Sequence, residues 1–74
     1  MAATVLGEFE GLASAEKARS VLLVAGVPET RITLSEKSGP SWTLSVYAES
    51  SFERERIQSL LRGQGALHTE QRER

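Results

Sequence analysis

Residues 30–50, TRITLSEKSGPSWTLSVYAES, contain the pattern that decides the fold. Ile32 and Leu34 alternate with polar residues, which is typical of a strand with one buried face. After the turn KSGPS the alternation returns, and its apolar residues are Trp42, Leu44, Val46 and Ala48. The stretch therefore predicts a β-hairpin with one apolar face. The opposite face is mixed and carries Thr33, Thr43, Ser45 and Tyr47.

A further strand is predicted at TVLGEFE, residues 4–10. Val5, Gly7 and Phe9 alternate toward the inside, and Leu6 lies on the opposite face with the polar residues of the hairpin. A glycine inside a strand weakens it unless another segment approaches the backbone closely. We therefore expect a helix to pack directly over Gly7.

Two helices are predicted, one on each side of the hairpin in the sequence. The first lies within residues 11–29, with Ser14 as its N-cap and Gly26 and Pro28 as its stop. Its apolar stripe consists of Ala15, Ala18, Val21, Leu22 and Ala25. The second opens at Ser50, which forms a capping box with Glu53. Its apolar stripe consists of Ile57, Leu60 and Leu61.

The element order gives the expected fold class. Residues 66–68, ALH, can add a last edge strand, and residues 70–74 are expected to be a polar C-terminal tail. The order β-α-β-β-α-β predicts an α+β, ferredoxin-like two-layer sandwich in residues 1–69, with an antiparallel sheet and both helices on one face. Its open sheet face favours a homodimer, through that face or through an edge strand.

Composition limits the partners that we expect. The 74 residues contain no cysteine, and nine Lys and Arg against ten Asp and Glu leave a formal net charge of -1. Such a charge does not concentrate nucleic acid, so no nucleic-acid partner is expected. No apolar stretch approaches the length that crosses a bilayer, and the first residues lack a signal-peptide pattern. We expect a cytoplasmic protein without a membrane partner.

The sequence also lacks the patterns of an active site. His68 is the only histidine, and no pair of acids stands near it at helical or hairpin ligand spacing, so a metal site is not expected. Ser14, Ser50 and Ser51 are explained by helix capping, and the GQG of residues 63–65 follows a helix, unlike a phosphate loop. We expect no catalytic residue and no cofactor.

Several residues remain as candidates for contact with another molecule. Leu23 projects among polar residues as either a singly exposed leucine or a subunit contact, and Phe52 must pack at the start of its helix or against another molecule. The candidate dimer or partner contacts are Leu6, Leu23, Tyr47 and Phe52. The candidate small-ligand turn contains Gly11 and Ser14.

Three stretches carry a family resemblance: GEFEGLASAEKARSVLLVAGVPETRITL (residues 7–34), WTLSVYAES (42–50) and LLRGQGALHTEQR (60–72). Together they resemble the bacterial general stress protein (heat-induced stress protein) domain, without the insertion that larger members carry between the two halves. The resemblance implies a small α/β domain with no established catalytic residue and a stress-related role.

The topology is shared by two other families. Amino-acid-sensing regulatory domains are similar in element order and imply a ligand at a dimer interface near the first strand-to-helix turn. The peptidoglycan-binding repeat is similar in the Phe after its first strand and in its Ala-rich first helix. The sequence therefore predicts a non-enzymatic domain that acts by self-association or protein binding, with ligand sensing and peptidoglycan binding as alternatives.

Overall fold

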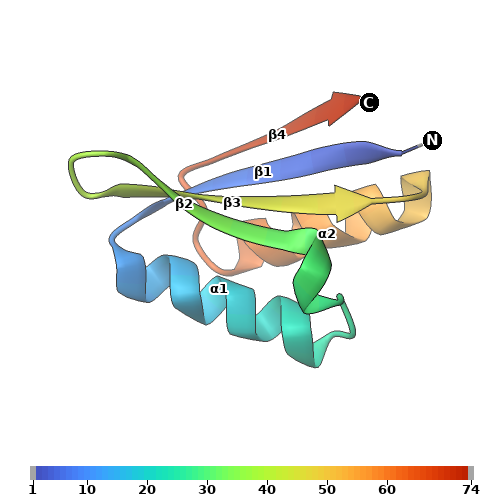
Figure 1. Ribbon diagram of the computed structural model, residues 1–74, viewed down its shortest axis with the longest axis horizontal. Helices are drawn as coiled ribbons and strands as arrows, with labels where there is room; N and C mark the ends of the chain where they lie inside the picture. Colours follow the sequence, from blue (N-terminus) through green and yellow to red (C-terminus); the bar gives the residue numbers. More distant parts are fainter. Residues whose placement is uncertain (1, 74) are drawn as a thin grey trace.

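The computed structural model describes residues 2–73. Their elements follow in the order β1 (Ala3–Glu10), α1 (Leu12–Val24), the short 3-10 helix η1 (Glu29–Arg31), β2 (Ile32–Ser38), β3 (Ser41–Ala48), α2 (Ser51–Gly63) and β4 (His68–Glu73). Figure 1 shows the four strands in one layer and both helices on the same side of it. The other side of the sheet has no covering layer within this part of the chain.

The strand order across the sheet is β2-β3-β1-β4, and all neighbouring strands are antiparallel. β1 is central, and its Val5 stands opposite Val46 of β3 on one side and opposite Gln71 of β4 on the other. This is the ferredoxin-like two-layer sandwich that the sequence predicted, and the fold class is confirmed.

A single apolar layer fills the space between the sheet and the helices. Its buried side chains are Ala3, Val5, Phe9, Ala15, Ala18, Leu22, Ile32, Leu44, Val46, Ala48, Ile57 and Leu61. The close approach expected at Gly7 is confirmed, because a Cβ built on this residue would lie 3.0 Å from Leu61 Cδ1 of α2. A glycine in the central strand therefore lets α2 lie against the sheet.

The first helix starts earlier than the sequence predicted. α1 begins at Leu12, and its N-cap is Gly11, whose φ of 87° turns the chain sharply out of β1. The Gly11 N–H donates a hydrogen bond to the Pro40 carbonyl in the hairpin loop, with an N–O distance of 2.7 Å. Ser14 is consequently an exposed residue inside the first turn, and its assignment as the N-cap was wrong.

The second helix begins as predicted, with Ser50 as its N-cap. The Glu53 N–H donates to Ser50 Oγ at 3.1 Å. The Glu53 carboxylate reaches one residue further back than in the usual capping box, because Glu53 Oε1 accepts from the Glu49 N–H at 3.1 Å. Arg31 holds the same corner by donating to Glu49 Oε1 at 2.6 Å and to Glu53 Oε2 at 3.5 Å.

The final strand lies later in the chain than expected. The sequence predicted it at residues 66–68, whereas β4 covers His68–Glu73 and pairs with β1 along Ala3–Glu8. Most of the expected polar tail is therefore strand. Its polar residues are accommodated on the helix side because Thr69 Oγ1 accepts from Gln58 Nε2 at 2.9 Å, and Gln71 Nε2 donates to Gln58 Oε1 at 2.6 Å.

Candidate interaction surface

The open face of the sheet is built by every second residue of its four strands. Cross-strand partners point to the same face of a sheet, so the registers of β1 with β3 and β4 determine its composition. Two central rows are Thr43–Glu8–His68 and Ser45–Leu6–Glu70. A third is Tyr47–Thr4–Arg72. The surface therefore combines hydroxyl groups, charges of both signs and one leucine, as the sequence indicated for Leu6 and Tyr47.

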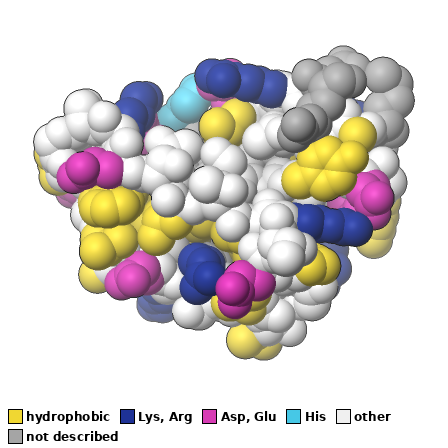
Figure 2. Space-filling view, viewed as in Figure 1, with side chains coloured by type: hydrophobic (Ala, Val, Ile, Leu, Met, Phe, Trp, Pro, Cys, Tyr) yellow, Lys and Arg dark blue, Asp and Glu magenta, His cyan; other side chains and the backbone are white. Residues whose placement is uncertain are grey.

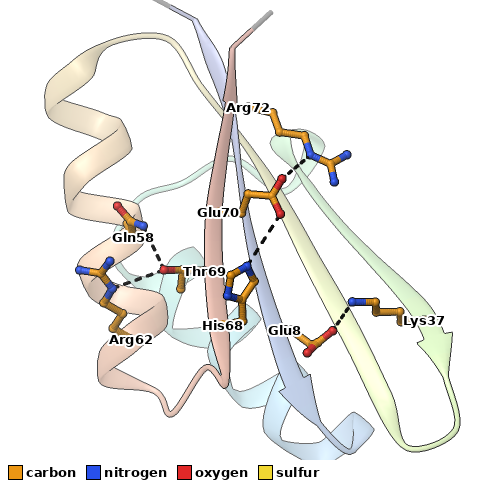
Figure 3. Close-up of polar contacts among 8 residues, drawn as sticks. All are labelled: Glu8, Lys37, Gln58, Arg62, His68, Thr69, Glu70 and Arg72. Atoms are coloured by element: carbon orange, nitrogen blue, oxygen red, sulfur yellow. Dashed lines mark hydrogen bonds and ion pairs between the residues drawn. The ribbon is translucent and has the colours of Figure 1, made fainter.

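One end of this face is hollowed to a volume of about 370 Å³. Leu6, Gly7 and Thr43 line it together with ionisable residues of β1, β2 and β4. Lys37 of β2 donates from Nζ to Glu8 Oε2 of β1, across the intervening strand β3. Figure 3 shows this pair on the same face as the charged residues of β4.

The charged residues of β4 form a short series along the strand. Arg72 Nε donates to Glu70 Oε2 at 2.7 Å, and His68 Nε2 lies 3.9 Å from Glu70 Oε1. The hydrogen bond from Arg72, followed by its positive charge, lowers the pKa of Glu70 below its ordinary value, with smaller effects from His68 and Lys37. Figure 3 shows these three side chains on one side of β4, and Thr69 directed to the other side, toward Gln58 and Arg62 of α2.

A second, shallower hollow of about 270 Å³ lies toward the other end of the face. Five hydroxyl-bearing residues and one arginine line it: Thr4, Thr30, Arg31, Thr33, Ser45 and Tyr47. The Arg31 guanidinium is already paired with the carboxylates of Glu49 and Glu53. The hollow is thus polar and nearly neutral.

The candidate contact residues separate onto different sides of the molecule. Leu6 and Tyr47 share the open face, whereas Leu23 belongs to α1 and Phe52 to α2. Leu23 is half-buried and packs against the core cluster, and its role as a subunit contact stays a prediction. Phe52 is 78% exposed in the first turn of α2.

The candidate ligand turn is a tight structural corner. Gly11 is held by its hydrogen bond to Pro40, and Ser14 is exposed within the first turn of α1. Neither residue lines either of the two hollows. A ligand at this turn stays a prediction.

Sequence reasoning missed Glu70 and Arg72. Both lie in the segment interpreted as a tail, where hydrophobic alternation gives no signal because TEQRE contains no apolar residue. The spacing of the ionisable residues could have indicated a shared face. His68, Glu70 and Arg72 occupy alternate positions, and alternate residues of an extended segment lie on the same face.

The polar and charged side chains of the described residues stay at the surface of the molecule. Among residues 2–73 no polar or charged residue is buried as a whole, and no three His, Asp or Glu residues cluster closely enough to hold a metal ion. Figure 2 shows basic and acidic side chains interspersed on the visible face, with hydrophobic groups in small separate areas. Neither helix of the described chain is long and apolar enough to cross a membrane.

Comparison of the chain with protein-family models, with curated proteins and with solved structures finds no match. The resemblance to the bacterial general stress protein domain therefore stays a prediction.

Proposed function

We propose that this chain is a non-enzymatic domain that acts by associating with a second copy of itself through its sheet. The observation that carries the proposal is the uncovered sheet: one face has no second layer, and β2 and β4 are edge strands without a further partner within the described residues. Exposed strand edges offer main-chain groups that readily pair with another strand.

Stability favours the same proposal. A domain of this size buries a smaller share of its surface on folding than a larger domain does, and here one thin apolar layer supplies the core. Association through the sheet adds contacts that the single copy lacks. The charges on the sheet are also of both signs, with Lys37 beside Glu8 and Arg72 beside Glu70, which suits contact between identical surfaces.

Sedimentation velocity over a range of micromolar concentrations tests the proposal. We expect a species of twice the 8.1 kDa mass that grows with concentration. The urea midpoint should also rise with protein concentration, since association stabilises only the folded chain. A strict monomer at every concentration would contradict self-association.

A variant outside the sheet shows which layer is used. Phe52 is an exposed apolar residue on the helix layer, and Phe52→Ser should leave the concentration dependence unchanged. If this substitution abolishes the dimer, association runs through the helices and the assignment to the sheet is wrong.

A further inference from the structure

The two edges of the sheet differ in their suitability for strand pairing. β4 extends over six residues, contains neither glycine nor proline, and pairs with β1 in one continuous register. β2 has a register shift between Glu36 and Ser38, and irregularities of this kind are a known protection of sheet edges. β4 is therefore the more regular template for an added strand.

The charges along β4 are complementary to a second copy of β4. When two identical edge strands join antiparallel, the two-fold axis is perpendicular to the sheet, so equal faces of the two copies lie on the same side. Placing Gln71 opposite Gln71 of the second copy then sets Glu70 opposite Arg72 of that copy. The symmetry repeats the contact, which gives two opposite-charge pairs.

The other edge has no such solution. The charged residues of β2 are Glu36 and Lys37, which are neighbours in the chain and stand at the register shift between Glu36 and Ser38. Because the register shift interrupts regular pairing where both charges stand, no regular symmetric register sets Glu36 against Lys37 of a second copy. Charge complementarity thus distinguishes β4 from β2.

The helix side of β4 is also prepared for this contact. Thr69 and Gln71 are both hydrogen-bonded to Gln58 of α2, and Thr69 accepts a further bond from Arg62 Nε at 3.3 Å. These bonds hold the inner-face side chains against α2, as Figure 3 shows for Thr69, and the outer edge of β4 has no neighbouring strand within the described residues.

We infer that two copies join by antiparallel pairing of their β4 strands, with Gln71 on the two-fold axis. The four strands of each copy then form one continuous sheet, and all helices lie on one face of it. The inference rests on the proposed self-association and names its surface. Glu70 and Arg72 then act across the interface as well as within each copy.

Charge reversal tests the pairing. In Glu70→Arg two arginines face each other at each symmetric contact, and in Arg72→Glu two glutamates do. Each change turns two favourable cross-strand contacts into unfavourable ones, so each variant alone should dimerise about 30-fold more weakly. An equimolar mixture of the two variants should recover a heterodimer near the original affinity, because opposite charges then face each other again.

Matched controls exist on the helix side of the molecule. Arg19 and Glu29 form an ion pair at 3.7 Å between α1 and η1. Arg19→Glu and Glu29→Arg therefore change the net charge in the same way, and both should dimerise as the original chain does. Equal dimerisation of the β4 variants and the unmodified chain would overturn the β4 pairing while leaving self-association in place, whereas a monomeric unmodified chain would overturn the proposed function itself.

A cysteine variant tests the axis independently of charge. The chain has no cysteine, so Gln71→Cys introduces a single thiol, which would face its own copy at a distance close to that of a disulfide. Mild oxidation should give a disulfide-linked dimer, while Ser35→Cys, on the exposed part of β2, should stay largely uncrosslinked. Crosslinking of the Ser35 variant in preference to the Gln71 variant would refute the inference.

Discussion

Gly7→Ala is expected to destabilise the protein, although alanine normally strengthens a strand. Gly7 is in the central strand, and an added Cβ would lie 3.0 Å from Leu61 Cδ1 and 3.2 Å from Phe9 Cε1. Carbon atoms at optimal contact are separated by about 3.5–4.0 Å. Leu61 and Phe9 are fully buried, so the new methyl group must displace α2 or force a side chain from its preferred rotamer.

The magnitude follows from two opposing effects. Overpacking a filled core costs about 1–3 kcal/mol. Replacing glycine with alanine lowers the entropy of the unfolded chain, which returns about 0.4–1 kcal/mol. We therefore expect the free energy of unfolding to fall by about 1 kcal/mol in the single variant.

Urea unfolding followed by the fluorescence of Trp42, the only tryptophan, measures this change at a fixed protein concentration. Leu61→Ala alone should cost about 2–5 kcal/mol. In that background Gly7→Ala should be neutral or stabilising, because its methyl group enters the vacated space. Gly63→Ala is the control, since nothing lies within 4 Å of a Cβ there. Additive effects at positions 7 and 61, or a stabilising Gly7→Ala in the unmodified chain, would refute the reasoning.

Two further predictions concern a helix cap and a carboxyl group. Ser50→Ala should lower the free energy of unfolding by about 1 kcal/mol in the same urea assay, because the Ser50 side chain caps α2. Ser14→Ala should cause no measurable loss, because Ser14 caps no helix. Equal losses in the two variants would contradict the assigned caps. Arg72→Ala should raise the pKa of Glu70 toward its ordinary value, measured by NMR titration of the side-chain carboxyl. Because the pKa of Glu70 is lowered in the folded chain, its contact with Arg72 stabilises the fold at pH values above the ordinary carboxyl pKa. This stabilisation is lost as the pH falls through the lowered pKa. An unchanged titration midpoint of Glu70 in the variant would show that Arg72 is not the cause of the shift.

The sequence by itself determined the central elements and their layers. Alternation at Ile32, Leu34 and Leu44 required one buried face, and the stripe of Leu22 and its neighbours required a helix against that face. These patterns are readable because they reflect the burial of apolar side chains, which is a property of each segment. Ser50 was identifiable for a similar reason, since a cap is a contact between residues three positions apart.

Tertiary structure alone decided where β4 lies and what surrounds its charges. A strand at an edge is held by main-chain hydrogen bonds with its neighbour, which any residue except proline can make, so no side-chain pattern was needed from Thr69 to Arg72. The pairing of Lys37 with Glu8, 29 residues apart in the chain, likewise exists only because the folded sheet brings β2 and β1 to either side of β3. Contacts between distant segments depend on register and packing, and those are properties of the whole molecule.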